Sequence, residues 1–294
     1  MTLAPPRSVT RLAHAKVNLH LRVLSKRPDG YHALETLFER VGLADRLTLE
    51  RSPGSRVELE CGGAAGIPPG EGNLVMKAAQ AFREASGWRD GVRITLEKKI
   101  PVGGGMGGGS SDAAATLLAF QELSGQALPP AGLMRCAREL GADVAFFAAD
   151  CPRAMGRGRG DEIEPLAEPG PTLWHLLVTP DFPVPTKAVY QALRLTAPGP
   201  DATLLLRNLK EGSVTDIRDH LFNALEPTVE HLYPAIRQVK SAVETLGGLP
   251  RPLVSGSGST VFAVAGSREE AEAAAERVLG THSGWHVSAT STQR

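Results

Sequence analysis

The chain has 294 residues, 42% of them hydrophobic and 22% charged, with 32 acidic and 32 basic side chains. This size and composition predict a globular protein of about two domains, and the zero net charge provides no global field that would attract nucleic acid or an anionic membrane. Cys61, Cys136 and Cys151 lack CxxC spacing and indicate free thiols in a cytoplasmic protein, for which we expect no signal peptide and no membrane-spanning segment.

Strands are expected at the start of the chain. Residues 8–24 predict two short strands or one bent hairpin, because apolar side chains recur at every second position. Lys16 and Asn18 fall in the opposite register, where such side chains are usually only solvated, so this segment alone favours a catalytic role for neither. Residues 46–50 and 56–60 alternate in the same way and look like a hairpin.

A turn-forming segment between these strands leads into an aromatic pair. Residues 25–30 read Ser-Lys-Arg-Pro-Asp-Gly and predict a tight turn, and Tyr31 and His32 follow directly. The pair could stack on a flat ligand and hydrogen-bond to it, or it could simply pack against the turn. The residues of this segment alone favour the second interpretation.

A glycine-rich loop lies between a predicted strand and a predicted helix. Asn73 is placed to cap a helix that ends near residue 86, residues 92–96 alternate as a strand, and residues 110–124 predict a helix. Six of the seven residues from Gly103 to Gly109 are glycines. Because each glycine costs conformational entropy on folding and a helix N terminus attracts anions, the loop predicts a phosphate-binding site rather than a mobile linker.

The residues in and around the loop argue against two common kinds of phosphate site. A Walker A motif requires a lysine where Gly109 stands, so that motif is excluded. The spacing Gly103-x-Gly105-x-x-Gly108 matches the dinucleotide fingerprint, but no second strand follows the helix, which argues against a Rossmann fold. Asp112 comes directly after the loop and either caps the helix or approaches a magnesium ion through water.

Another carboxylate stands in an unusual position further along the chain. A helix is predicted from Pro130 to Leu140, and Asp143 follows between a helix-ending glycine and an apolar run. Since aspartate is rarely buried without a partner, Asp143 either caps the next segment or acts in a partly dry site. The basic run from Arg153 to Arg159 could bind a small anionic ligand.

The C-terminal half predicts an α+β arrangement behind a linker-like segment at residues 168–171. The expected elements are a strand at 174–179, a helix that Thr186 caps and that contains Tyr190, a helical stretch over 221–246 interrupted by prolines, a strand–turn–strand over 252–264, a helix over 268–279 and a strand at 285–288.

These motifs together resemble a known family. The loop Pro-x-Gly-Gly-Gly-x-Gly-Gly-Gly-Ser-Ser, the early Ala-Lys-x-Asn strand and the late Ser-Gly-Ser-Gly turn resemble the GHMP kinases, a superfamily that includes galactokinase, homoserine kinase and mevalonate kinase. The more specific segments are Pro28-Asp29-Gly30-Tyr31-His32 and Gly141-Ala142-Asp143-Val144. They are similar to the branch that phosphorylates a cytidine-diphosphate-linked methylerythritol in the non-mevalonate isoprenoid route.

The resemblance implies a fold and a reaction. The fold would be α+β and two-lobed, with an N-terminal lobe (1–168) like the second domain of ribosomal protein S5 and a C-terminal lobe (169–294) like a ferredoxin-type sandwich. The reaction would transfer the γ-phosphoryl group of ATP, used with Mg²⁺, to the 2-hydroxyl of the cytidine-diphosphate-linked substrate. No protein ligand of the metal is assigned, and neither nucleic acid nor a membrane is an expected partner.

The resemblance also implies roles for individual residues. Lys16 and Asp143 would be the catalytic pair, and Tyr31 and Tyr190 would flank the cytosine while His32 reads its edge. Asn18 and Thr186 would also bind the substrate. The nucleotide would be bound by Asn73 and by the loop residues Pro101, Val102, Gly103, Gly104, Gly105, Met106, Gly107, Gly108, Gly109, Ser110 and Ser111.

Other functions remain open from the sequence. A sister kinase acting on mevalonate or homoserine would share the loop but would have no base for Tyr31 and His32 to recognise. A non-catalytic RNA- or nucleotide-binding module is disfavoured by the balanced charge. A dinucleotide-dependent oxidoreductase is disfavoured by the missing second strand.

Overall fold

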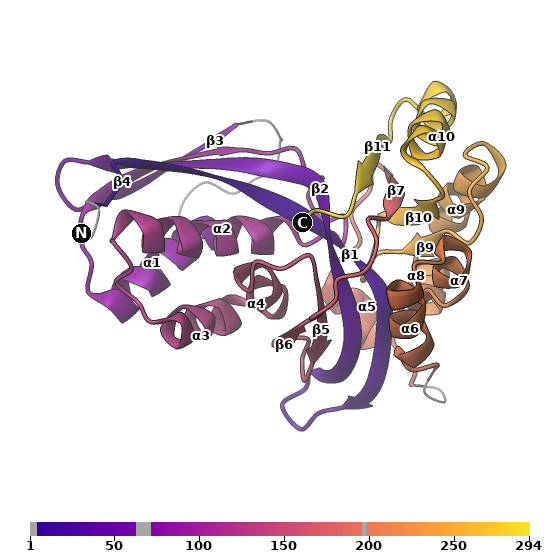
Figure 1. The fold of residues 1–294 in the computed structure, drawn as a ribbon, viewed down its shortest axis with the longest axis horizontal. Helices are drawn as coiled ribbons and strands as arrows, with labels where there is room; N and C mark the ends of the chain where they lie inside the picture. Colours follow the sequence, from indigo (N-terminus) through magenta and orange to yellow (C-terminus); the bar gives the residue numbers. More distant parts are fainter. Residues whose placement is uncertain (1–4, 63–71, 196–198) are drawn as a thin grey trace. The chain divides into compact units, whose positions relative to one another are not determined.

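The protein is described here by a computed structural model, which covers residues 5–62, 72–195 and 199–294. The chain divides into two compact units, neither of which is one continuous segment (Figure 1). Unit 1 comprises Met1–Ala15, Ala44–Val102 and Gly107–Asp150. Unit 2 comprises Lys16–Leu43, Gly103–Met106 and Cys151–Arg294. The long strands β1 (Ser8–Lys26) and β2 (His32–Ser52) contribute residues to both units.

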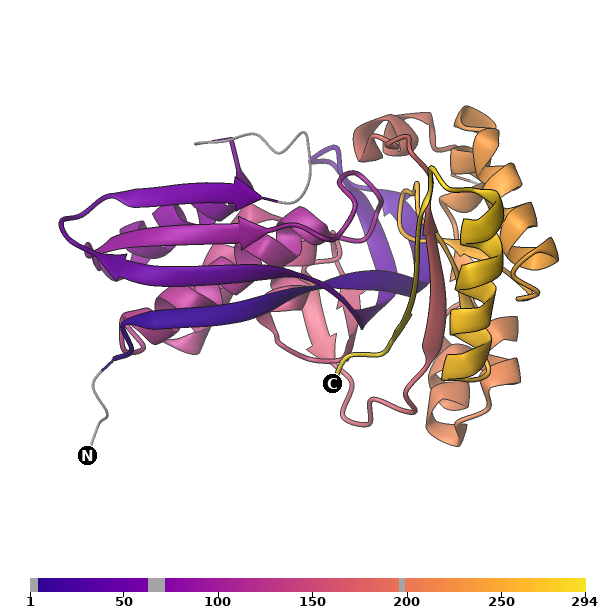
Figure 2. The same ribbon diagram turned by 90° about the horizontal axis from the view of Figure 1, so that it is seen from above.

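Unit 1 is a sheet with helices packed on one face (Figures 1 and 2). Its further elements are β3 (Val57–Gly62), α1 (Leu74–Ser86), β4 (Gly91–Glu97), α2 (Gly108–Leu123), α3 (Pro130–Leu140) and α4 (Ala142–Ala148). Strand β4 lies between β2, to which it is antiparallel, and β3, to which it is parallel. Leu47 and Leu49 are fully buried while Arg46 and Glu50 are exposed, so the alternating pattern of β2 here places one face in the core.

The helix that follows the glycine loop is the central element of unit 1. Nearly every residue of α2 from Ser111 onward is buried, and α2 packs against α1, α3 and α4. Its many alanines allow this close packing on several sides. Phe120 of α2 lies against Phe82 of α1 with ring centroids 5.6 Å apart, and both side chains are fully buried. The start of α2 is therefore held by a well-packed core.

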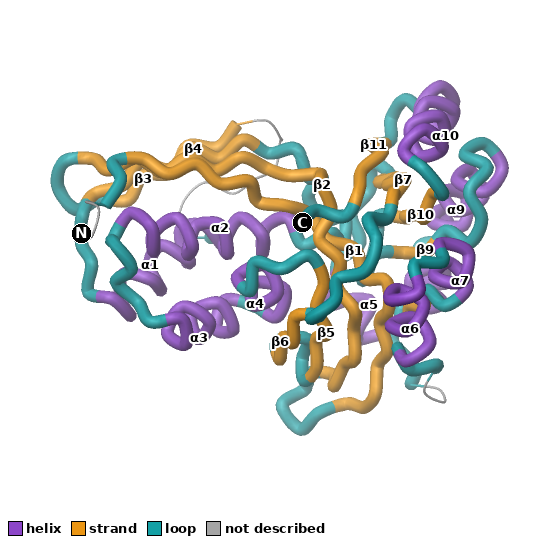
Figure 3. The backbone as a smooth tube through the Cα atoms, viewed as in Figure 1, coloured by secondary structure: helices purple, strands orange, loops and turns teal. Residues whose placement is uncertain are grey.

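Unit 2 combines two groups of strands with several short helices (Figure 3). Its further elements are β5 (Arg153–Arg157), β6 (Glu162–Pro165), β7 (Trp174–Thr179), α5 (Thr186–Ala192), α6 (Thr203–Glu211), α7 (Val214–Asp219), β8 (Phe222–Asn223), α8 (Glu226–Leu232), α9 (Ala235–Thr245), β9 (Leu253–Val254), β10 (Val261–Ala265), α10 (Arg268–Thr281) and β11 (His286–Ser291). The hairpin β5–β6 extends from β2, while β8 is parallel to β1.

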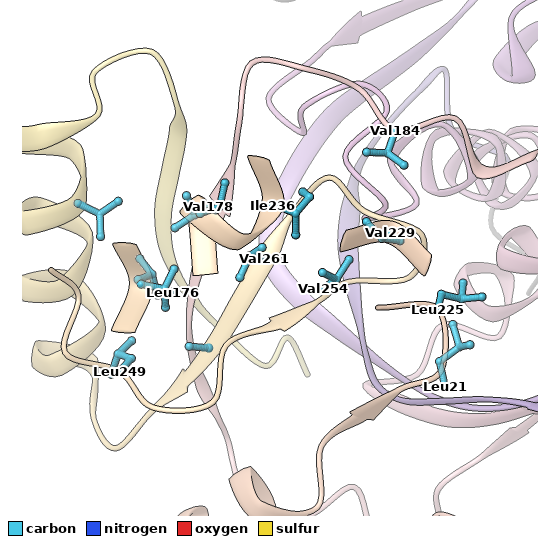
Figure 4. Close-up of a cluster of buried hydrophobic side chains, with 14 of the residues drawn as sticks. Leu21, Leu176, Val178, Val184, Leu225, Val229, Ile236, Leu249, Val254 and Val261 are labelled. Atoms are coloured by element: carbon cyan, nitrogen blue, oxygen red, sulfur yellow. The ribbon is translucent and has the colours of Figure 1, made fainter. Parts of the chain in front are cut away.

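The core of unit 2 is built on an antiparallel sheet with the order β11-β7-β10-β9. Leu176, Val178 and Val261 from this sheet pack with Ile236 of α9 and Val229 of α8 (Figure 4). Helix α10 packs against β7, β10 and β11 of the same sheet. These buried aliphatic side chains fix the position of the turn between β9 and β10, which contacts the glycine loop.

The α+β class predicted from the sequence is confirmed, and several elements agree closely. Helices α1, α3 and α10 and strands β7 and β11 lie where the patterns predict them. The two prolines split the stretch 221–246 into α8, which has Pro227 in its first turn, and α9, which Pro234 precedes. Within the described ranges, no helix combines the length and the apolar character needed to cross a bilayer.

Two expectations about the strands were wrong, and two helices were missed. Residues 8–24 form one continuous strand rather than two, in line with the absence of Gly and Pro from this stretch. Residues 46–50 and 56–60 do not form a hairpin, because β4 lies between β2 and β3. Helices α6 and α7 were not predicted, since α6 starts right after a segment rich in proline and glycine that is typical of a linker.

Candidate active site

The first half of the glycine loop, Gly103–Met106, belongs to unit 2 and packs on the turn between β9 and β10. The Gly104 carbonyl accepts a hydrogen bond from the backbone N–H of Thr260 (3.0 Å). The Gly105 carbonyl accepts one from Ser255 Oγ (3.2 Å). Gly105 has φ +75°, and a Cβ atom there would lie 2.4 Å from the Ser255 carbonyl oxygen. Only glycine fits this position without a shift of the backbone.

Lys16 connects strand β1 to the same loop. Its Nζ donates to the Gly105 carbonyl (2.9 Å) and to Asn18 Oδ1 (2.6 Å). The Asn18 amide in turn donates to Thr36 Oγ1 (2.8 Å). The expectation that Lys16 and Asn18 are solvated was wrong, because both are buried, with 4% and 2% of their surface exposed. An ammonium in such a place needs acceptors, and here the loop carbonyl and the asparagine supply them.

The second half of the loop belongs to unit 1 and opens helix α2. Gly107 is the N-cap residue with φ 70°, and no side chain caps the helix. The first N–H groups of a helix have no intrahelical partner, and together with the helix dipole they favour an anion. The uncapped start of this long helix therefore has free donors for an anion, and the phosphate site stays a prediction.

Asp112 is not the cap of α2, contrary to one of the two expectations. The helix begins at Gly108, two residues earlier than predicted, so Asp112 lies beyond its first turn. The buried Lys98 ammonium donates to Asp112 Oδ2 (2.7 Å) and also to Asp45 Oδ2. Burial raises the pKa of Asp112 to about 7; attraction by Lys98 opposes the rise and repulsion by Asp45 adds to it. A Cβ at Gly108 would lie 3.0 Å from Ile100 Cγ2 and 3.3 Å from Lys98 Nζ, so the glycine leaves space for both side chains.

Two further predicted site residues lie in helical first turns or caps of unit 1. Asn73 is the N-cap of α1, and its Oδ1 accepts a hydrogen bond from Val75 N (2.9 Å), which confirms the predicted cap. Asp143 is the second residue of α4, whose N-cap is Gly141. The alternative that Asp143 caps this segment was therefore wrong.

The aromatic residues of the predicted substrate site gather in unit 2. The ring of His32 stacks on that of Tyr190, with centroids 5.3 Å apart and planes inclined by 30°. Burial and the positive charge of Lys26 lower the pKa of His32, so its imidazole is neutral at pH 7. Tyr31 is 58% exposed, and the Arg159 guanidinium lies over its ring at 5.2 Å from the centroid.

Thr186 does not cap α5 as expected. The N-cap is Pro185, and Thr186 is the first helical residue. Its hydroxyl instead forms a hydrogen bond with Ser257 Oγ (2.8 Å), in the turn that also holds the glycine loop. Thr186 and Gly105 thus contact the same short turn.

The described residues do not offer an evident protein site for a metal. No group of three or more His, Cys, Asp or Glu side chains in residues 5–62, 72–195 and 199–294 is arranged to hold an ion. The Asp112 carboxylate, which the sequence offers as a water-mediated magnesium ligand, is bound to Lys98. We therefore assign no residue of this chain to Mg²⁺.

Comparison with known proteins identifies the family of this chain. The profile described as GHMP kinases N terminal domain matches residues 73–150, and that described as GHMP kinases C terminal matches residues 205–282. The chain belongs to the GHMP kinase family. As a member it is a small-molecule kinase, and the family membership predicted from the loop, strand and turn motifs is confirmed.

Relatives of this GHMP kinase are similar over nearly their whole length. The 4-diphosphocytidyl-2-C-methyl-D-erythritol kinase of Pelotomaculum thermopropionicum is 42% identical over 275 residues, covering 93% of this chain and 94% of the relative. The kinase of the same name from Citrifermentans bemidjiense is 42% identical over 281 residues, covering 96% and 98%.

Solved structures show the same fold. A crystal structure of 4-(cytidine 5'-diphospho)-2C-methyl-D-erythritol kinase superposes with a TM-score of 0.82 at 39% identity, covering 97% of this GHMP kinase and 100% of that chain. A homoserine kinase from Cytophaga hutchinsonii superposes with a TM-score of 0.75 at 21% identity, covering 98% and 95%, which shows the fold alone.

Sequence reasoning missed several residues of this GHMP kinase that support the loop. Lys98 was not singled out, although a lysine between a strand and a glycine loop is a signal for a cation near the helix start. Ser255 and Ser257 lie in the recognised Ser-Gly-Ser-Gly turn and Thr260 lies two residues after it, but the pattern does not show which of these residues contacts the loop. Asp45 gave no signal, because it lies inside an alternating strand.

Proposed function

We propose that the protein phosphorylates the 2-hydroxyl of 4-diphosphocytidyl-2-C-methyl-D-erythritol with ATP, in the cytoplasm and in the non-mevalonate route to isoprenoid precursors. The observation that carries this proposal is the 42% identity with kinases of that name over more than nine-tenths of both chains. The stacked pair of His32 and Tyr190 supports it, since such a pair suits a pyrimidine base and has no evident use for a simple alcohol.

The glycine loop is the proposed site of the nucleotide phosphates. Bound ATP supplies the γ-phosphoryl group. The uncapped N–H groups at the start of α2 would donate to phosphate oxygens, and Pro101 to Ser111 with Asn73 would line the nucleotide. Phosphoryl transfer requires chiefly positioning and charge neutralisation, which a loop held by packing on both sides can provide.

Asp143 and Lys16 are the proposed catalytic pair. The Asp143 carboxylate would accept the proton of the 2-hydroxyl as the new oxygen–phosphorus bond forms and the bond to the ADP leaving group breaks. Lys16 would favour the ionised form of that carboxylate and offset charge on the transferred group. Its bonds to Asn18 and Gly105 fix the ammonium at the loop, which supports this role.

The cytidine group is proposed to bind at the aromatic residues of unit 2. A neutral imidazole has one donor and one acceptor nitrogen, so His32 can pair with the edge of a cytosine. Stacking on Tyr190 fixes the plane of the His32 ring. Tyr31 and Tyr190 would flank the base, and Asn18 and Thr186 would contact the rest of the substrate. We also propose that the functional domain boundary lies near residue 168, between the two matched profiles.

The test is a phosphoryl-transfer assay with the cytidylyl substrate on the wild type and on Asp143→Asn. We expect turnover in the wild type, a loss of roughly 10²–10⁴-fold in kcat for the variant, and nearly unchanged ATP binding. Asp90→Asn is the matched control, because Asp90 is an exposed carboxylate of the same unit that pairs with Arg51.

A substrate panel separates this proposal from a sister activity. Mevalonate and homoserine are tested beside the cytidylyl substrate at the same enzyme concentration. A wild type that phosphorylates mevalonate or homoserine but not the cytidylyl compound would overturn the proposed substrate. Full activity of Asp143→Asn would overturn the proposed proton acceptor.

A further inference from the structure

The basic run from Arg153 to Arg159 does not act as one anion site. Arg153 is buried and paired with Glu39, and Arg157 is exposed and paired with Glu164. Arg159 remains, in the turn between β5 and β6, and its guanidinium carbon lies 5.2 Å from the centroid of the Tyr31 ring. The expectation that the basic run binds a small anionic ligand is thus wrong for Arg153. Arg159 instead contacts Tyr31, which is a predicted substrate-binding residue.

Arg159 is fixed by one neighbouring carboxylate. Its backbone N–H donates to Asp161 Oδ1 (3.1 Å), and its Nε and Nη2 donate to Asp161 Oδ2 (3.1 and 2.7 Å). The Asp161 side chain is only 14% exposed. The turn itself is tied to β2, because the Gly158 carbonyl accepts from Leu34 N (2.8 Å). The planar guanidinium is therefore held in one orientation before any ligand binds.

Tyr31 is fixed at its backbone, but its ring has no place in the core. The Tyr31 N–H donates to Asp29 Oδ1 (3.1 Å), and its carbonyl accepts from Arg27 N (2.7 Å). With 58% of its surface exposed, the side chain could turn freely if nothing contacted the ring. The Arg159 guanidinium covers the ring and limits this rotation. A ring with fewer accessible rotamers loses less entropy when a base stacks on it.

We infer that Arg159, oriented by Asp161, is a positioning residue that holds the Tyr31 ring as a stacking surface for the pyrimidine of a cytidine-diphosphate substrate. The inference rests on the proposed function for the identity of the base. It assigns Arg159 an effect on substrate binding that acts through Tyr31, with no effect on the chemical step. Contacts between a cation and an exposed aromatic ring are modest, so the effect on affinity is modest too.

The experiment is a double-mutant cycle on Arg159→Met and Tyr31→Ala, read by calorimetric binding of CDP and by steady-state kinetics. For Arg159→Met we expect CDP affinity to fall about two- to fivefold. We expect KM for the cytidylyl substrate to rise by the same factor, while kcat and KM for ATP stay unchanged. In the Tyr31→Ala background, the further substitution of Arg159 should change neither quantity. The matched control is Arg157→Met in the same hairpin, which should behave as wild type.

Several outcomes would overturn the inference. An equal loss of affinity from Arg159→Met with and without Tyr31 would show a direct contact, and a fall in kcat would show a role in chemistry. Failure of the proposed function would look different. A wild type that binds CDP but does not phosphorylate the cytidylyl substrate would overturn the function and leave the coupling between Arg159 and Tyr31 in CDP binding unaffected. Conversely, normal turnover with no effect of Arg159→Met removes the inference and leaves the function.

Discussion

Glu39 and Arg153 form an ion pair from which solvent is excluded. Arg153 Nε lies 3.1 Å from Glu39 Oε2, and neither side chain has any exposed surface. His175 Nε2 lies 3.0 Å from the other Glu39 oxygen, and Arg153 also donates to Thr292 Oγ1 (3.0 Å). The network joins β2, β5, β7 and the residue after β11 within unit 2, and every charged group in it has a partner.

Removing one member of this pair should destabilise the fold strongly. Glu39→Gln leaves the Arg153 guanidinium buried without a counter-charge, so we expect a loss of about 3–5 kcal/mol in the free energy of unfolding. The measurement is urea denaturation followed by circular dichroism. Glu164→Gln, which breaks the exposed pair with Arg157, is the control and should cost less than about 1 kcal/mol. Similar losses for both variants would contradict the role given to the buried pair.

The same carboxylate should make unit 2 sensitive to acid. Burial alone would raise the pKa of Glu39, but Arg153 and His175 outweigh it and lower the pKa from 4.5 to about 2. The unfolded chain therefore binds the proton first, and the stability that Glu39 contributes is present above pH 4.5 and is lost as the pH falls toward 2. Unfolding free energies measured across this window should fall more steeply for the wild type than for Glu39→Gln. Parallel curves would count against the lowered pKa.

Asp112 should give the opposite pH dependence. Since its pKa is raised to about 7, the folded protein keeps a proton that the unfolded chain has released above roughly pH 4. Its contribution to stability therefore declines as the pH rises from about 4 to 7, by up to about 1.4 kcal/mol per pH unit. Asp112→Asn should remove this decline while still accepting a hydrogen bond from Lys98. We expect the variant to gain stability relative to the wild type as the pH increases, and a constant difference would refute this.

Alanine substitutions in the two halves of the glycine loop should have different effects on stability. Gly105→Ala forces a positive φ on a residue with a Cβ that would meet the Ser255 carbonyl at 2.4 Å, so we expect a loss of at least about 1–2 kcal/mol and weaker ATP binding. Gly109→Ala lies in a helix with its nearest contact, Leu74 Cδ1, at 3.6 Å. It should be neutral or stabilise the fold by up to about 1 kcal/mol. Thermal unfolding of both variants checks the contrast.

The parts of the fold that local patterns determine were predicted well. Asn73 caps α1 because its short side chain can reach the N–H of Val75, and this signal lies within a few residues of sequence. The glycine loop between a strand and a helix, together with the Ala-Lys-x-Asn strand and the Ser-Gly-Ser-Gly turn, was enough to identify the family. Both predictions depend on neighbours in the chain and not on distant contacts.

What was missed depends on residues far apart in the sequence. Lys16 was expected to be solvated, because nothing near it shows that a loop 89 positions later supplies the Gly105 carbonyl as an acceptor. Arg153 belonged to an apparent basic run, but its partner Glu39 is 114 positions away. Asp112 was expected to cap α2, but the helix starts two residues earlier than predicted, and Asp112 pairs with Lys98 instead. Such pairings become visible only when the strands and helices are assembled.

The hydrogen bonds of Thr292 have a practical consequence for anyone preparing shortened versions of this protein. Its hydroxyl bonds to Glu39, Arg153 and Leu173, and its backbone pairs with Val41 and Leu173. A truncation before Thr292 would remove only the last three residues. It would nevertheless deprive the buried Glu39 carboxylate and the buried Arg153 guanidinium of one hydrogen-bond partner each. We expect such a fragment to accumulate in inclusion bodies.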